Sequence, residues 1–168
     1  MHILFLCTGN SCRSLIAEAL FNHLVQTSAH RHWRALSAGS QPAGKLNERA
    51  LALLAREGIA TDGYFSKSWN ALPVTPDVVI TVCASAAGET CPAYLGPVLR
   101  GHWGVDDPSH VTGSETEIEH AFARAYAILH ARIEAFLALP LDALAQERAR
   151  LQAELERIGR IDPSGAAC

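Results

Sequence analysis

The sequence predicts one α/β domain of three layers, in which a four-stranded parallel sheet has helices on both faces. Residues 2–6 form a continuous apolar run after His2, and residues 78–82 are almost entirely β-branched and apolar, which is typical of parallel strands buried on both sides. Segments with helical periodicity alternate with the predicted strands along the chain, as a parallel sheet requires. With 168 residues, 49% of them hydrophobic, the chain is long enough to bury one substantial core.

The N-terminal third supplies the first two predicted strands and two helices. Helical periodicity begins at Ser14, and its apolar positions share one face: Leu15, Ile16, Ala19, Leu20 and Leu24. Residues 33–37 form the second predicted strand, and the turn residues 39–42 close it. A second helix is predicted over residues 47–57, with Gly58 placed as its C-terminal cap.

The remainder of the chain supplies two more strands and a long helix. Residues 78–82 give the strongest strand signal, and residues 98–103 form the fourth predicted strand. Ser114 and Glu117 match a capping box, which predicts a helix running from there to about residue 138.

A helical extension is predicted after the long helix. Pro140 ends that helix, and four apolar residues then mark one face of a further helix ending at Gly159: Leu144, Leu151, Leu155 and Ile158. We therefore divide the chain into a main domain, residues 1–139, and a C-terminal extension with a small polar tail, residues 140–168. The apolar face of the extension either packs on the domain or serves self-association.

Charge and composition exclude several classes of partner. A net charge of -3 gives no reason to expect nucleic acid or an anionic membrane as partner. No stretch approaches the roughly 20 apolar residues of a membrane span, and the apolar start at residues 1–6 is too short for a signal peptide. We expect a cytoplasmic protein, whose thiols are kept reduced. The five cysteines then favour reactive thiols, metal ligands or buried residues over a disulfide framework.

The segment CTGNSCRS, residues 7–14, has the features of an oxyanion-binding loop. Cys7 ends the first strand, at the sheet edge where α/β proteins bind ligands. Gly9 and Asn10 tolerate positive φ, so the backbone can turn with its N–H groups inward beside a helix N-terminus. Arg13 adds a fork of donors suited to a tetrahedral oxyanion. The predicted anion-binding residues are Thr8, Gly9, Asn10, Ser11, Cys12, Arg13 and Ser14.

The same environment favours a nucleophilic thiolate at Cys7. The helix terminus, the inward amides and the charge of Arg13 all stabilise a negative sulfur. Ser14 is placed to donate a further hydrogen bond to it. Cys12 is either a small loop residue or a thiol that pairs with Cys7 under oxidation.

These motifs resemble those of a known family. The pattern Cys-x5-Arg-Ser, together with Ser-Ala-Gly at residues 37–39 and Asp-Asp-Pro at residues 106–108, resembles the low-molecular-weight protein tyrosine phosphatases and the arsenate reductases that share their fold. The resemblance runs from the first strand to about residue 138, so residues 1–139 would be the catalytic domain. It implies that Cys7 is the nucleophile, Arg13 the oxyanion clamp and Asp107 the general acid, with Asp106 a structural neighbour.

Two reactions of this family remain as alternatives, hydrolysis of phosphomonoesters and reduction of arsenate. Hydrolysis needs one cysteine, whereas reduction needs a relay of thiols. Cys83 and Cys91, in the segment VCASAAGETCP, resemble the second and third redox cysteines of the thioredoxin-coupled arsenate reductases. Ser109 and His110 follow the Asp-Pro, where the tyrosine phosphatases commonly have aromatic residues. We therefore predict arsenate reduction, and keep tyrosine phosphatase activity as the alternative.

The resemblance also implies the partners of the reaction. No cofactor would be bound; an external thiol reductant, thioredoxin or glutathione with glutaredoxin, would regenerate the enzyme, and phosphate or sulfate would compete with arsenate. In some reductases a monovalent cation supports the loop through an asparagine, a helix glutamate and a downstream aspartate. Asn10, Glu18 and Ser37 match that site, but Lys67 stands where the aspartate would be, so we predict no bound metal. We place Cys168, at the terminus, outside the relay.

Overall fold

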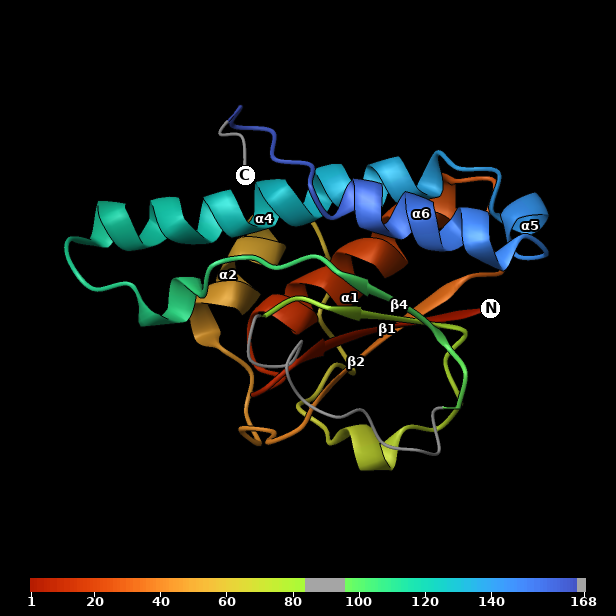
Figure 1. The fold of residues 1–168 in the computed structure, drawn as a ribbon. Coiled ribbons are helices and arrows are strands. Elements are labelled where there is room, and N and C mark those ends of the chain that lie inside the picture. Colours follow the sequence, from red (N-terminus) through yellow and green to blue (C-terminus); the bar gives the residue numbers. More distant parts are fainter. Residues whose placement is uncertain (84–95, 166–168) are drawn as a thin grey trace.

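The computed structural model describes residues 1–83 and 96–165, and these form one parallel sheet with helices packed on it (Figure 1). The strands lie in the order β2-β1-β3-β4, and every neighbouring pair is parallel. They are β1 (His2–Cys7), β2 (Arg34–Gly39), β3 (Val78–Thr81) and β4 (Leu99–His102). The helices are α1 (Arg13–Leu24), α2 (Glu48–Arg56), α4 (Glu115–Leu137), α5 (Leu141–Leu144) and α6 (Arg148–Ile158), with short 3-10 turns η1 (Val25–Thr27), η2 (Trp69–Ala71) and η4 (Pro108–His110). The predicted four-stranded α/β fold is confirmed.

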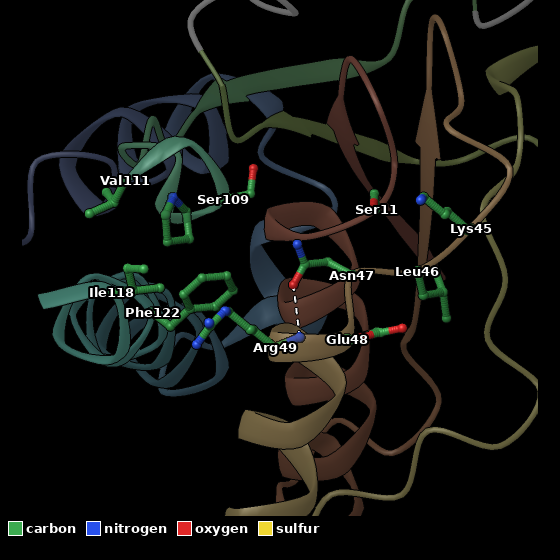
Figure 2. A pocket seen from close by; sticks show the side chains of 11 residues that line it. Ser11, Lys45, Leu46, Asn47, Glu48, Arg49, Ser109, Val111, Ile118 and Phe122 are labelled. Atoms are coloured by element: carbon green, nitrogen blue, oxygen red, sulfur yellow. Dashed lines mark hydrogen bonds between the residues drawn. The ribbon is translucent and has the colours of Figure 1, made fainter. Parts of the chain in front are cut away.

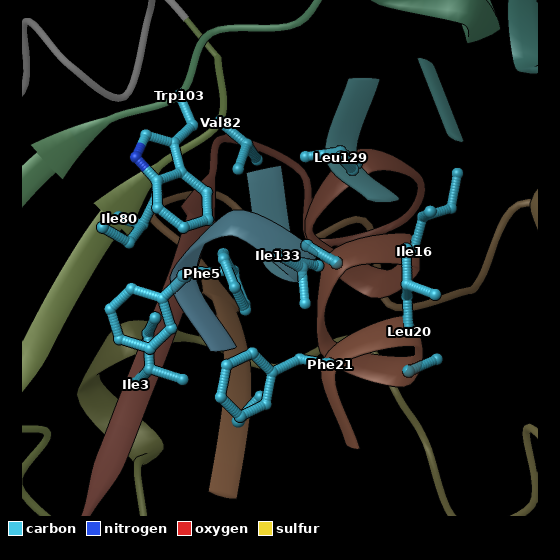
Figure 3. Close-up of a cluster of buried hydrophobic side chains, with 14 of the residues drawn as sticks. Ile3, Phe5, Ile16, Leu20, Phe21, Ile80, Val82, Trp103, Leu129 and Ile133 are labelled. Carbon is cyan, nitrogen blue, oxygen red and sulfur yellow. The ribbon is translucent and has the colours of Figure 1, made fainter. Parts of the chain in front are cut away.

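The central strand β1 is buried on both faces, as its continuous apolar run predicts. Ile3 and Phe5 point to a large core that all the long helices share, which Figure 3 shows with Phe21 and Trp103 packed around Phe5. On the opposite face, Leu4 and Leu6 join a smaller cluster with Trp69 and Leu72, at and next to η2. Among the described residues the α-helices therefore cover one face of the sheet, and the helical layer predicted on the other face consists of the 3-10 turn η2.

The helix ends follow local capping chemistry. Asn47 caps α2 by accepting hydrogen bonds from the backbone of Arg49 and Ala50, and Gly58 follows the helix with φ +72°. The capping box of Ser114 and Glu117 is present at the start of α4. These boundaries agree with the predicted ones to within one or two residues.

The C-terminal extension packs on the domain, but as two helices. A turn after Leu144 separates α5 from α6, where the sequence predicted one continuous helix. The apolar positions Leu144, Leu151, Leu155 and Ile158 are all buried in the large core. The amide of Gln152 donates to the carbonyl of Arg100 at 2.8 Å and accepts from its N–H at 3.4 Å, so α6 satisfies part of the exposed edge of β4.

The strand register brings the predicted site to one edge of the sheet. Cys7 lies opposite Gly39, and Thr81 lies opposite His102, so the loops that follow all four strands begin at the same edge. Gly39 comes very close to the loop after β1, since a Cβ on it would lie 2.4 Å from the Thr8 carbonyl oxygen. Among the helices of the described segments, none has the length and apolarity needed to cross a membrane.

Candidate active site

The loop at residues 7–14 has its carbonyl groups turned outward. The carbonyls of Thr8, Gly9 and Ser11 accept hydrogen bonds of 2.8–3.0 Å from backbone amides of residues 41–47. The amide of Asn10, in contrast, donates inward to Cys7 Sγ at 3.1 Å. The loop thus forms a concave nest above the N-terminus of α1, a geometry that suits an anion.

Asn10 is the residue that turns this loop. It has φ +43° and is fully buried, whereas Gly9 keeps an ordinary φ, although the sequence suggested either residue for the left-handed position. Its side-chain oxygen accepts from the Lys67 N–H at 2.7 Å, which fixes the orientation of the amide. Its Nδ2 then donates to the hydroxyl oxygens of Ser14 and Ser37, at 3.0 and 2.8 Å. These bonds hold the backbone of Asn10 in a left-handed conformation that residues other than glycine rarely adopt.

The Ser14 hydroxyl is directed at Cys7. Its oxygen lies 2.9 Å from Cys7 Sγ and already accepts a hydrogen bond from Asn10. The hydroxyl proton is therefore available for a hydrogen bond to the sulfur.

A buried carboxylate and a cation complete the hydrogen bonds behind Cys7. Ser37 donates to Glu18 Oε2 at 2.5 Å, and Lys67 Nζ lies 3.6 Å from the same oxygen. Burial raises the pKa of Glu18, while the Ser37 hydrogen bond and the Lys67 charge act in the opposite direction. We call Asn10, Ser14, Glu18, Ser37 and Lys67 the buried network.

An ion pair lies on the other side of Cys7. Arg13 donates to Asp107 Oδ2 at 2.7 Å and to the Val105 carbonyl at 2.9 Å. Asp107 caps η4 by accepting from the amide and hydroxyl of Ser109, at 2.9 and 2.6 Å. Burial would raise the pKa of Asp107, but these hydrogen bonds, Arg13 and His110 outweigh it and hold the pKa below its ordinary value.

Two adjacent hollows meet at this ion pair. A cavity of about 440 Å³ lies over the loop and is lined by Cys7, Thr8, Arg13 and Asp107, among others. A second, of about 380 Å³, shares Arg13 and Asp107 with it and is lined by Cys83. We call Arg13, Cys83, Asp107 and His110, which line these hollows, the open side of Cys7.

The cysteines differ in their surroundings. Cys83 follows β3, and its Sγ lies 3.8 Å from the Thr8 hydroxyl, so it stands at the rim of the anion loop. Cys12 is a buried residue of the loop itself, next to the start of α1, and burial, with a smaller contribution from Asp107, raises its pKa to about 12. Such a thiol is a poor nucleophile, which agrees with a structural role for Cys12. Cys91 and Cys168 lie outside the described residues.

A further pocket borders the loop and contains residues that the sequence did not indicate. Figure 2 shows it between α2 and α4, with Ser11 and Ser109 at the boundary with the cavity over Cys7. Its volume is about 420 Å³. Phe122 and Ile118 of α4 form an apolar wall opposite Asn47 and Arg49. Phe122 lies within the predicted long helix, but no local motif links it to the loop, so the sequence did not indicate it.

The fold and the site together define a class of protein: an α/β domain in which a buried cysteine, an arginine and an aspartate surround a nest of the kind that binds oxyanions. The chain belongs to the low molecular weight phosphotyrosine protein phosphatase family, whose model matches residues 2–153. The match extends beyond residue 138, where the motif resemblance ended, and includes part of α6.

Similar proteins within this family include arsenate reductases. The arsenate reductase of Shouchella clausii (strain KSM-K16) is 37% identical over 135 residues, covering 80% of this chain and 93% of the relative. The crystal structure of arsenate reductase from Archaeoglobus fulgidus DSM 4304 is 25% identical, with a TM-score of 0.66, and covers 82% of this chain and 99% of that one. A thioredoxin-dependent arsenate reductase of Corynebacterium glutamicum is 27% identical, with a TM-score of 0.51, over 74% of this chain and 57% of that one.

Proposed function

We propose that this protein reduces arsenate to arsenite, with Cys7 as nucleophile and Cys83 as the second thiol. The observation that carries the proposal is the position of Cys83, which contacts Thr8 of the anion loop at 3.8 Å and lines a hollow that shares Arg13 with the cavity over Cys7. Hydrolysis would not need a thiol there, whereas reduction does. The similarity to proteins named arsenate reductase supports the same choice.

The first step binds arsenate in the loop and forms a bond to sulfur. The anion takes up the inward amides and competes with Asp107 for Arg13. Its negative charge and the loss of that ion pair both raise the pKa of Asp107 from its lowered value, which is the direction a general acid requires. The Cys7 thiolate attacks arsenic, an arsenic–oxygen bond breaks, and the oxygen leaves as water with a proton from Asp107.

The second step transfers the electrons. The Cys83 thiolate attacks Cys7 Sγ, and the sulfur–arsenic bond breaks with its electron pair remaining on arsenic. Arsenic passes from the pentavalent to the trivalent state and leaves as arsenite, while a Cys7–Cys83 disulfide forms. In this step the buried network has no chemical role other than to keep Cys7 Sγ in position for the attack by Cys83.

The third step restores the Cys7 thiol. Cys91 attacks Cys83, which releases Cys7 and leaves a Cys83–Cys91 disulfide for an external thiol reductant. Thioredoxin is the reductant we favour, with glutathione and glutaredoxin as the alternative. The relay needs a compartment in which thiols are kept reduced, which is the basis of the predicted cytoplasmic location.

Hydrolysis of phosphomonoesters is the alternative function. The pocket in Figure 2 is the observation in its favour, since an ester group on a bound phosphate would extend from the loop toward Phe122. In that reaction water, and not Cys83, would attack the intermediate on Cys7.

Two assays on the same preparation separate these functions. The first measures arsenate-dependent oxidation of NADPH coupled through thioredoxin and thioredoxin reductase, and the second measures hydrolysis of an aryl phosphate. We expect NADPH oxidation that requires both arsenate and thioredoxin, is inhibited by phosphate, and is lost in Cys7→Ser. Fast hydrolysis with no arsenate-dependent oxidation of NADPH, using either thioredoxin or glutaredoxin, would contradict the proposal.

A further inference from the structure

The buried network contains one carboxylate, that of Glu18, and one cation, that of Lys67. The two side chains are 6% and 10% exposed, and Lys67 Nζ lies 3.6 Å from Glu18 Oε2. A buried carboxylate without a counter-charge is unfavourable, because few water dipoles remain to stabilise it. Lys67 therefore supplies the charge that allows Glu18 to remain ionised beside Ser37.

The ammonium of Lys67 is held firmly in this position. It donates to the Phe65 carbonyl at 3.2 Å and lies 4.8 Å from the centre of the Phe65 ring. The backbone of Lys67 is fixed as well, since its N–H donates to Asn10 Oδ1 at 2.7 Å and its carbonyl accepts from the Gly39 N–H at 2.9 Å. The same residue thus orients Asn10 through its backbone and neutralises Glu18 through its side chain.

A monovalent metal ion does not fit beside these residues. Asn10, Glu18 and Ser37 would supply oxygen ligands for such an ion, as the sequence resemblance implied. The Lys67 ammonium, however, already lies beside the Glu18 carboxylate, so a metal ion there would face a like charge at close range.

We propose that Lys67 is a positioning residue that takes the place of a bound monovalent cation and thereby holds the Ser14 hydroxyl on Cys7. Ser37 uses its proton on Glu18, so its oxygen can accept from Asn10. Asn10 in turn donates to Ser14, which leaves the proton of Ser14 for the sulfur. The inference rests on the proposed function only in taking Cys7 as the nucleophile.

Other charged or titratable groups also lie near the two ends of this chain of hydrogen bonds, which are Cys7 and Glu18. Around Cys7 these are Arg13 and Asp107 of the ion pair, the nearby His110, and the thiols of Cys12 and Cys83. Around Glu18 they are Lys67 and the hydroxyl of Tyr64. In Lys67→Met, which removes the charge of Lys67, all the other groups stay unchanged.

The experiment measures alkylation of Cys7 by iodoacetamide as a function of pH, by peptide mass spectrometry and without arsenate. We expect Lys67→Met to move the midpoint of the pH–rate profile upward and to slow alkylation at neutral pH by about 3–10-fold. Replacing tetramethylammonium chloride by potassium chloride at equal ionic strength should restore part of this loss, and leave the wild-type protein unchanged. Arg31→Met, which removes an exposed cation, is the matched control.

A double variant keeps the test valid if Lys67→Met folds poorly. Glu18→Gln combined with Lys67→Met removes both charges, so no buried charge is left unpaired. The pH–rate profile of this double variant should lie closer to wild type than that of Lys67→Met. Lys67→Arg keeps the positive charge and should retain the wild-type profile. A folded Lys67→Met protein with the wild-type profile would overturn the proposal, as would a double variant shifted as far as the single one. Because arsenate is absent, failure of the proposed reduction would not affect this result.

Discussion

The two sides of Cys7 differ in how firmly their side chains are bound to one another. In the buried network every hydroxyl, amide and carboxylate has partners inside the protein, and Glu18 and Lys67 are nearly inaccessible. On the open side, Arg13 and Asp107 are 14% and 22% exposed and His110 is 85% exposed at the rim, while Cys83 lines a hollow but is itself buried. We therefore expect the first set only to hold Cys7 in place, and the second to exchange its partners for a substrate.

This difference separates what hydrolysis and reduction have in common from what determines which of the two follows. A cysteine sulfur fixed under an oxyanion nest suits both hydrolysis and reduction, because both begin with attack by sulfur. The choice between them depends on what reaches Cys7 next, and Cys83 is on the open side. The predictions below test this separation, from the largest expected effect to the smallest.

After loss of Cys7 or Cys83, removal of the acid on the open side should have the largest effect. Asp107→Asn keeps the size of the side chain but cannot protonate the leaving oxygen, so kcat for arsenate reduction should fall by about 10²–10⁴-fold. Alkylation of Cys7 should be no slower than in wild type, since the buried network is intact. Asp106→Asn, which changes the exposed neighbour, is the control. Equal activities of the two variants would remove Asp107 from the mechanism.

The lowered pKa of Asp107 also predicts a small change in acid stability. Because the folded state binds this proton less readily than the unfolded chain, the stabilisation is present above the ordinary aspartate pKa of about 3.9 and is lost as the pH falls through the lower folded value. As the pH is lowered through this acidic range, the melting temperature of wild type should therefore fall more than that of Asp107→Asn. Parallel curves would contradict this.

Replacement of the clamp should have the next largest effect. Arg13→Lys keeps the charge but loses the fork that contacts both Asp107 and Val105, so kcat/KM for arsenate should fall by about 10²–10³-fold. Inhibition by phosphate should weaken in parallel, because the two anions use the same site. If phosphate inhibited this variant as well as wild type, Arg13 would not be the clamp.

Crowding of the loop should lower stability and anion binding together. In Gly39→Ala the new Cβ would lie 2.4 Å from the Thr8 carbonyl oxygen and 3.0 Å from the Asn10 nitrogen, so the loop must shift. We expect a loss of about 1–3 kcal/mol in the free energy of unfolding, measured in urea. Gly44→Ala, where φ is +74° but no atom lies near the new Cβ, separates crowding from backbone strain. Wild-type phosphate binding in Gly39→Ala would show that the close approach is unimportant.

Loss of one bond in the buried network should have the smallest effect. Ser14→Ala removes a single hydrogen bond to the sulfur, worth about 1–1.5 kcal/mol, so alkylation of Cys7 near neutral pH should slow about 10-fold. The KM for arsenate should change less than kcat. An unchanged rate of alkylation would mean that the Ser14 proton does not stabilise the thiolate.

The sequence predicted most of the fold because its signals are local. The apolar runs of β1 and β3, the capping box at Ser114 and the glycine after α2 each act within a few residues. The division of the extension into α5 and α6 was not predictable, since the apolar positions from Leu144 to Ile158 suit one helix as well as two. The contact of Gln152 with β4 depends on tertiary packing alone.

The site was predictable to the extent that its residues share a motif. Cys7, Arg13 and Ser14 lie within eight residues, and Asp107 precedes a proline after a strand. Cys83 is far from the motif in sequence, but its place after a strand and the family resemblance indicated it, and its Sγ lies 3.8 Å from the Thr8 hydroxyl. The wall formed by Phe122 also belongs to a distant segment, and no motif or spacing indicated it.

The proposed role of Cys83 is tested most directly by a single substitution measured in two assays. Cys83→Ser should abolish the thioredoxin-coupled oxidation of NADPH with arsenate. The same variant should keep the wild-type rate of Cys7 alkylation and any wild-type hydrolysis of an aryl phosphate, because the loop and the buried network are unchanged. A Cys83→Ser protein that reduces arsenate at the wild-type rate would contradict the account.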